Sequence, residues 1–315
     1  MTETMAPHSA QPVDAIASLP GLVPFMTDDA LIDLVSIGNV VCQMAIAAAP
    51  SLRPQIGAAL AEVGSGPALI TLANNHAVEI RPFSLTRMIE RFGTEKALLA
   101  AIESRADLTD DLWGQLAAAR LRILLEGFDD ALSEDDVERV VIAMLRDVSD
   151  QAREAYARHF VRAGTVTPGL LFRSILSGEA DVFSALVSGL TELPVDEILT
   201  TLRVATPDNV EALAKLAGVP DAFVPTFAAA IAALRSERGF ADKSGPVRVN
   251  PIILKQLRAV IARDESSVHE ALLDRLMRLE GELKSVPQTA IVIADAIAAE
   301  SNVTPFRRPG ERDAA

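Results

Sequence analysis

Few residues of this 315-residue chain have a type and spacing that suit catalysis or ligand binding. Asn74, Asn75 and His76 stand together at the end of an apolar stretch, so a polar ligand site between helices is one hypothesis for them. The alternative is that Asn ends a helix and that His interacts with the helix dipole. Cys42 lies in the apolar run VVCQMAIAAA, which favours a buried small side chain over a nucleophile.

Metal sites and known catalytic motifs are not indicated. The 4 histidines are scattered, without the paired spacing of a zinc site. The acidic block DDALSEDD lacks the alternating acids and central glycine of a calcium loop, whereas Ser133 followed by Asp136 predicts a capping box at a helix start. No GxGxxG, GxxxxGK[ST], GxSxG or HExxH motif is present. We therefore expect no catalytic residue, no bound metal and no cofactor.

The charge of the chain argues against nucleic acid as a partner. It has 43 acidic and 29 basic residues, a net charge of −14, and only 4% aromatic residues. Phosphate binding needs Lys and Arg, and base stacking needs aromatic rings. Residues 101–150 hold 13 acids and 5 bases. This stretch predicts either a solvated face or a docking surface for a basic protein, at Asp129, Asp130, Glu134 and Asp135.

The apolar content is high, at 50% of residues and a mean hydropathy of +0.26. The most apolar stretches, Val40–Ala49, Phe223–Leu234 and Ala290–Ala299, are shorter than the roughly 20 residues that a membrane-spanning helix needs. The start of the chain, MTETMAPHSAQPVD, does not resemble a secretory signal. The single Cys42 forms no internal disulfide. We expect a cytoplasmic protein without a membrane span.

Three glycines mark an internal repeat. Gly38, Gly64 and Gly93 each follow an apolar residue by four positions and precede a second apolar segment. Two helices in a unit of about 20–50 residues are typical of an α-solenoid. We expect each glycine to end its helix in the left-handed conformation. The following units are predicted to begin with caps at Ser51, Ser84 and Thr109.

Helix starts elsewhere carry a hydroxyl followed by acids or proline, as at Thr27, Ser133, Thr167 and Thr206. The best linker candidate is GFADKSGPVRVNP, which is rich in Gly and Pro. The predicted organisation is a disordered tail at 1–20, a helical-repeat domain at 21–238, a linker at 239–251, C-terminal helices at 252–300 and a disordered tail at 301–315.

The predicted helix within 266–284 has apolar residues at nearly heptad spacing. They are Val268, Leu272, Leu276, Leu279 and Leu283. One interpretation is an amphipathic helix that packs on its own chain, with Arg275, Arg278 and Glu282 among the residues of its outer face. The alternative is a self-association helix that forms a homodimer.

The repeat stretches LVSIGNVVCQMAIAAAPSL and LITLANNHAVEI, with the later LLFRSILSGE, LTELP and AGVP, resemble the bacterial family called domain of unknown function 2336. The resemblance covers roughly 27–235. It implies HEAT-like helical repeats of a mostly alphaproteobacterial family, and it carries over no catalytic residue.

These patterns together predict an all-α protein, a HEAT-like α-solenoid of antiparallel helix pairs with a C-terminal helical extension. We expect a non-catalytic scaffold or regulator that binds another protein along the concave face of the solenoid. One alternative is a small-molecule sensor or enzyme with a pocket near Asn74–His76. The other is a homo-oligomeric assembly protein that associates through 266–284.

Overall fold

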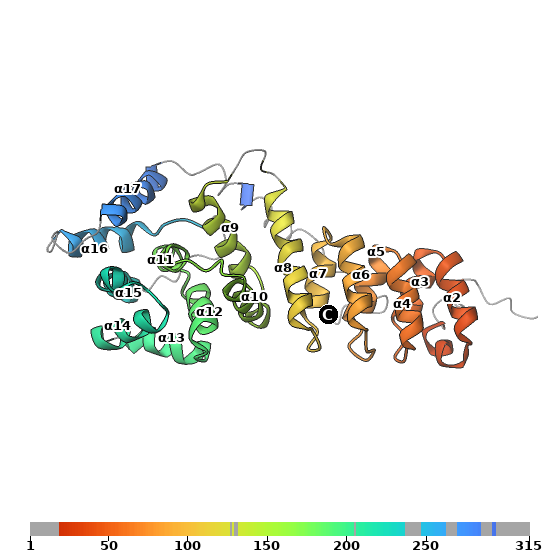
Figure 1. Ribbon diagram of the computed structural model, residues 1–315. Helices are drawn as coiled ribbons and strands as arrows, with labels where there is room; N and C mark the ends of the chain where they lie inside the picture. Colours follow the sequence, from red (N-terminus) through yellow and green to blue (C-terminus); the bar gives the residue numbers. More distant parts are fainter. Residues whose placement is uncertain are drawn as a thin grey trace, which may run out of the picture. The chain divides into compact units, whose positions relative to one another are not determined.

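The computed structural model describes residues 19–126, 128, 132–204, 206–236, 247–262, 270–284 and 292–293. These residues form helices and no strand, which confirms the predicted all-α class (Figure 1). The chain divides into two compact units, Met1–Arg120 and Leu121–Ala315. The division falls inside the predicted repeat domain, 21–238, and away from the predicted linker. Both predicted tails lie outside the described residues, except residues 19 and 20 of the first tail, which are helical.

The first unit is a stack of short helices in two layers (Figure 1). Its elements are η1 (Val23–Phe25), α2 (Asp28–Ile37), α3 (Val40–Ala47), α4 (Pro54–Val63), α5 (Gly66–Asn74), α6 (Pro82–Phe92), α7 (Lys96–Glu103) and most of α8 (Asp110–Leu125). Helices α2, α4 and α6 pack on one another in one layer, and α3, α5 and α7 do so in the other. This alternation is the predicted solenoid-like arrangement of helix pairs.

The helix starts of the first unit follow two local rules. Thr27 and Thr109 accept hydrogen bonds from the backbone N–H of Ala30 and Leu112, as predicted for capping residues. The predicted caps at Ser51 and Ser84 are wrong, because proline begins both helices: Pro54 starts α4 and Pro82 starts α6. Proline is well suited to the first helical position, where its missing N–H leaves no hydrogen bond unmade.

The repeat glycines do end their helices, but the predicted left-handed conformation is wrong. Gly38 and Gly64 are extended, with φ of −70° and −64°, and Gly93 has φ of −66°. Glycine is required here because the backbone passes close to a carbonyl oxygen of the preceding turn. A Cβ on Gly64 would lie 2.5 Å from the carbonyl oxygen of Leu60. The N–H of Gly64 donates to that same oxygen at 2.7 Å, so the backbone must come this near.

Side chains of one repeat bind the helix-terminal carbonyl oxygens of the repeat before it. The amide of Asn75 donates to the carbonyl oxygens of Ala47 and Ala49, at 2.9 and 2.7 Å, where α3 ends. The last carbonyls of a helix have no partner within the helix, so they need donors from elsewhere. Similar bonds join Arg53 to Met26, and Arg91 to Ala61 and Gly64.

Arg105 makes the most extensive of these ties. Its guanidinium is buried and donates to the carbonyl oxygen of Val78 at 2.9 Å, and to those of Ala73 and Asn75 at 3.3 and 3.4 Å. It also pairs with Asp107. One side chain therefore closes the end of α5 and the turn that follows it.

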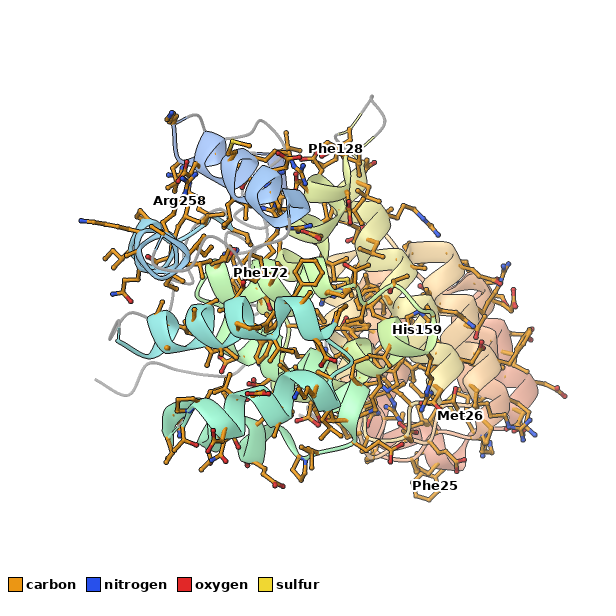
Figure 2. The ribbon with its side chains drawn as sticks, turned by 60° about the vertical axis from the view of Figure 1, so that its left-hand side comes forward. Phe25, Met26, Phe128, His159, Phe172 and Arg258 are labelled. Atoms are coloured by element: carbon orange, nitrogen blue, oxygen red, sulfur yellow. The ribbon has the colours of Figure 1, made fainter. Side chains whose placement is uncertain are left out.

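The second unit surrounds the central helices α11 and α12. Its elements are α9 (Glu134–Arg146), α10 (Asp150–Arg162), α11 (Pro168–Leu176), α12 (Ala180–Thr191), α13 (Val195–Val204), α14 (Pro207–Leu216), η2 (Asp221–Phe223), α15 (Val224–Ser236), α16 (Pro251–Ile261) and α17 (Glu270–Lys284). Helix α12 packs on α10, α11 and α13, and α15 packs on α11, α14 and α16. Phe172, which Figure 2 shows among these helices, lies 5.7 Å from Phe227 between ring centroids.

The C-terminal helices belong to this second unit. The predicted linker lies outside the described residues at 239–246, and its described end is packed rather than free. Val247 and Val249 are buried, and the N–H of Asn250 donates to the carbonyl oxygen of Leu176 at 2.7 Å. The chain therefore enters α16 already attached to the end of α11.

We predict that Arg105→Ala lowers the free energy of unfolding of the first unit by about 1–3 kcal/mol, because buried carbonyl oxygens lose their donor. Thermal or urea unfolding followed by circular dichroism measures this. Arg87→Ala is the control, since Arg87 pairs with Glu62 and Glu90 at the surface, and it should leave the unfolding midpoint unchanged. Equal midpoints for both variants would contradict the role given to Arg105.

Candidate functional site

An apolar groove opens in the second unit between the end of α8 and helices α9, α10 and α11. Its volume is about 210 Å³. The lining residues are Leu121, Leu125, Leu132, Glu134, Val137, Glu138, Val140, Val141, Phe160, Thr165, Thr167 and Leu170. Most of them are aliphatic or aromatic, so the groove offers water almost no hydrogen-bonding surface.

The polar groups of the lining are largely used by the chain itself. The hydroxyl of Thr165 donates to the carbonyl oxygen of Phe160 at 3.0 Å, and that of Thr167 accepts from the N–H of Leu170 at 3.1 Å. Glu134 is exposed at the first turn of α9. Val137, one turn later, is 49% exposed. The groove thus combines an open apolar floor with a carboxylate at its rim.

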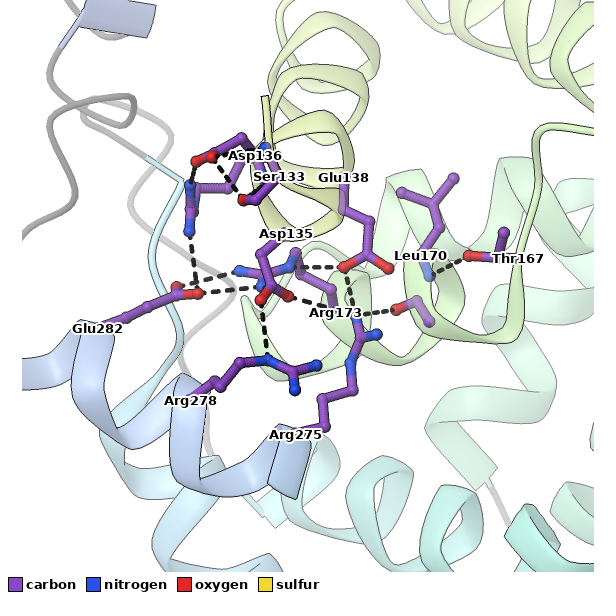
Figure 3. Close-up of polar contacts among 12 residues, drawn as sticks. Ser133, Asp135, Asp136, Glu138, Thr167, Leu170, Arg173, Arg275, Arg278 and Glu282 are labelled. Carbon is purple, nitrogen blue, oxygen red and sulfur yellow. Dashed lines mark hydrogen bonds and ion pairs between the residues drawn. The ribbon is translucent and has the colours of Figure 1, made fainter. Parts of the chain in front are cut away.

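A cluster of eight charged residues, here called the charged cluster, adjoins the groove through Glu138, which belongs to both. Figure 3 shows the polar contacts of this cluster. Asp135, Asp136, Glu138 and Arg139 come from α9, Arg173 from α11, and Arg275, Arg278 and Glu282 from α17. Four carboxylates therefore face four guanidinium groups. The local sequence explains the position of the α9 acids, because Ser133 and Asp136 form the predicted capping box and so fix the start of the helix.

Arg173 is the centre of the charged cluster. Its side chain is only 1% exposed. It donates to Glu138 at 2.8 Å, to Asp135 at 2.5 Å and to both carboxylate oxygens of Glu282 at 3.0 Å. Figure 3 shows it between carboxylates of α9 and α17. A buried arginine with this many charged acceptors is fully paired, which is the condition under which a charge can be buried at all.

Helix α17 completes the cluster from the other side. Arg278 donates to Asp135 at 3.2 Å, and Arg275 donates to Glu138 and to the carbonyl oxygen of Gly169. A Cβ on Gly169 would lie 2.5 Å from a Glu138 oxygen and 2.6 Å from Nη1 of Arg275. Glycine at this position therefore makes room for the ion pair.

The cluster shifts the ionisation of its members. Burial by itself would lower the pKa of Arg173, but hydrogen bonds and charge from Glu282 and Glu138 raise it above its ordinary value. Burial would raise the pKa of Asp135, yet Arg173, Arg275 and Arg278 hold it below its ordinary value of 3.8. Both groups are therefore held in their charged forms.

The predicted docking acids are separated by the structure. Asp129 and Asp130 lie outside the described residues. Glu134 lies at the rim of the groove, whereas Asp135 is paired inside the charged cluster. Of the four residues, Glu134 is therefore the described one that is open to a partner.

The polar segment at the end of α5 has a structural explanation. Asn75 binds the end of α3, and the amide of Asn74 donates to the carbonyl oxygen of Ile70 within its own helix. His76 is exposed. Cys42 is half-buried, and burial raises the pKa of its thiol, which opposes the reactive thiolate form. Within the described residues, no group of His, Cys, Asp and Glu could hold a metal ion.

The proposed self-association residues are also divided. Leu276 and Leu279 are buried against the chain itself, and Leu283 is exposed. Val268 and the side chain of Leu272 lie outside the described residues. The prediction of an outer face is wrong for Arg275 and Glu282, which are largely covered and pair with α9 and α11. Arg278 is 55% exposed, as predicted, although it also pairs with Asp135. Hydrophobic spacing located the apolar side of α17 but could not show that the charged side meets opposite charges.

Arg173 was not singled out from the sequence, although a signal was present. It is the only charged residue in the helix PGLLFRSIL. A lone arginine within an apolar helix predicts a buried ion pair, and its partners lie 35 and 109 positions away. The sequence offered no means of finding them.

A family model described as "Uncharacterised protein conserved in bacteria (DUF2336)" matches residues 23–276. No curated protein and no solved structure matches the chain. No helix among the described residues is long and apolar enough to cross a membrane.

We predict that Arg173→Met destabilises the second unit by about 3–5 kcal/mol, because Asp135, Glu138 and Glu282 lose the buried guanidinium that they share. Urea unfolding at pH 7 measures the loss. Arg158→Met is the control, since Arg158 is half exposed and pairs only with Glu154 among the ion pairs described. A midpoint for Arg173→Met equal to that of the control would show that the buried ion pairs contribute nothing.

The lowered pKa of Asp135 predicts an acid-sensitive contribution to stability. A carboxylate whose pKa is lower in the folded state stabilises the fold at pH values above its ordinary pKa of 3.8. This contribution is lost as the pH falls through the pKa of the folded state. The difference in unfolding free energy between the wild type and Asp135→Asn should therefore be positive at pH 7 and shrink below pH 3.8. A difference that grows on acidification would contradict this sign.

Proposed function

The chain belongs to the DUF2336 family of uncharacterised bacterial proteins, and we propose that it is a non-catalytic helical protein that binds another protein through the groove of its second unit. The observation that carries this proposal is an open, apolar groove with a carboxylate at its rim. We further propose a scaffolding or regulatory role in the cytoplasm, which the single cysteine and the absence of known catalytic motifs support.

The size of the groove favours a protein side chain as its occupant. Pockets for drug-sized ligands typically have volumes of about 300–1,000 Å³. The groove has about 210 Å³, and a cavity of about 150 Å³ suffices for a benzene ring. It therefore has room for one aromatic or branched aliphatic side chain. Burial of such an anchor is a common source of affinity in helix-in-groove recognition.

The rim of the groove indicates the charge of the partner. Glu134 is exposed beside Val137 and has no ion pair among those described. An Arg or Lys next to the apolar anchor would lie close to this carboxylate. The acids of α9 that lie further along are already matched by arginines of the chain. We therefore propose a helix with one large apolar anchor flanked by a basic residue as the partner segment.

Two variants test the groove directly. Val137→Asp places a charge on the floor of the groove. Val204→Asp is the control, because it introduces the same charge on α13, where Val204 is 66% exposed. Each full chain is immobilised, and proteins captured from a bacterial lysate are quantified by mass spectrometry. We expect a partner that the wild type and Val204→Asp retain equally, and that Val137→Asp retains at least tenfold less. Glu134→Lys should also weaken its retention.

Two results would contradict the proposal. Proteins retained equally by Val137→Asp and Val204→Asp would show that the groove is not the binding site. A partner whose retention does not change with Glu134→Lys would remove the basic residue from the proposed partner segment. Val137→Asp and Glu134→Lys must keep the helical circular dichroism and the unfolding midpoint of the wild type.

A further inference from the structure

We propose that the face of α9 and α11 beneath α17 is a second protein-binding surface, and that α17 is its intramolecular occupant. The partner would be a helix with arginines three residues apart and a glutamate four residues after the second. It would displace α17 and take its place. This inference rests on the proposed function only in that the chain binds proteins, and it concerns the side of α9 that faces α17, which shares only Glu138 with the groove.

Helices α9 and α11 are joined to each other by ion pairs that do not involve α17. Arg173 of α11 already binds Asp135 and Glu138 of α9, at 2.5 and 2.8 Å. The capping box of Ser133 fixes the first turn of α9, on which Asp135 stands. A helix that arrives here therefore meets carboxylates and a guanidinium that are already held in place, which lowers the entropic cost of binding.

The charge pattern of α17 matches this surface. α9 and α11 contribute three carboxylates and two guanidinium groups to the charged cluster, whereas α17 contributes two guanidinium groups and one carboxylate. Arg275, Arg278 and Glu282 stand at positions i, i+3 and i+7, on one side of the helix. α9 and α11 together thus have an excess of one negative charge, and α17 has an excess of one positive charge.

The fit of α17 is incomplete at the centre of this surface. Glu138 is only 4% exposed, and its buried Oε1 has no hydrogen-bond partner. Nε of Arg275 is also buried without a partner. Buried polar atoms are normally satisfied. An unmatched acceptor beside an unmatched donor indicates that a helix with a donor placed on this oxygen would bind the surface better than α17 does.

The forces that hold α17 are suited to exchange. It is attached by the buried side chains of Leu276 and Leu279 and by ion pairs, and the attraction within a buried ion pair is largely offset by the cost of desolvating both charges. Arg278 is 55% exposed, so salt screens its pair with Asp135. The ion pairs therefore specify where α17 lies more than they prevent it from leaving.

The test uses full-length chains and a fluorescent peptide of the α17 sequence, Glu270–Lys284. The double variant Arg275→Glu/Arg278→Glu releases the chain's own α17 from the surface. The control Arg158→Glu/Lys215→Glu changes the same charges at exposed positions. By fluorescence anisotropy, we expect the peptide to bind the double variant at least tenfold more tightly than it binds the wild type or the control. A peptide with both arginines changed to glutamate should not bind.

Equal binding of the peptide to all three chains would overturn the inference. Hydrogen exchange of the wild type gives a second measurement that does not depend on the folding of the variant. We expect the amides of α17 to exchange at least tenfold faster than those of α11, since α17 leaves while the unit stays folded. Exchange of α17 together with α11 would identify α17 as a permanent part of the fold and overturn the proposal.

Light scattering separates the remaining alternative, a second copy of the chain as occupant. A dimer that the double variant dissociates would show exchange of α17 between copies and would overturn the proposal of a different partner. If Val137→Asp loses the partners captured by the wild type and the α17 peptide binds all three chains equally, the proposed function stands and only this inference is rejected. Peptide binding without any groove partner would do the reverse.

Discussion

The structure of the first unit depends on the carbonyl oxygens at the ends of its helices. The last four carbonyls of any helix lack a partner within it. Helices of 8 to 11 residues, such as α3 and α6, carry this deficit over much of their length. Asn75, Arg91 and Arg105 supply the missing donors from the following repeat. Each repeat therefore needs the next one for hydrogen bonding as well as for apolar burial.

The second unit solves a different problem, the burial of charge. Arg173 is almost inaccessible to water, and three carboxylates from two other helices surround it. Such an arrangement is costly unless every charge is matched. It therefore fixes α9, α11 and α17 in one particular register, in a way that Leu and Val contacts alone do not.

Much of the fold could be predicted from local patterns, because capping and helical periodicity act over a few residues. Thr27, Ser133 and Thr167 begin helices as expected. The conformation of Gly64 could not be predicted, since both extended and left-handed glycine end helices and the choice depends on the next turn. The charged cluster could not be predicted either, because Arg173 and Glu282 are 109 positions apart in the chain.

Glu138 belongs to two features at once, since it lines the groove and pairs with Arg173 and Arg275. An occupant of the groove that reorients this carboxylate changes the free energy with which α17 is held. By thermodynamic linkage, the position of α17 then changes the affinity of the groove by the same factor. One shared carboxylate would thus couple the two proposed binding events.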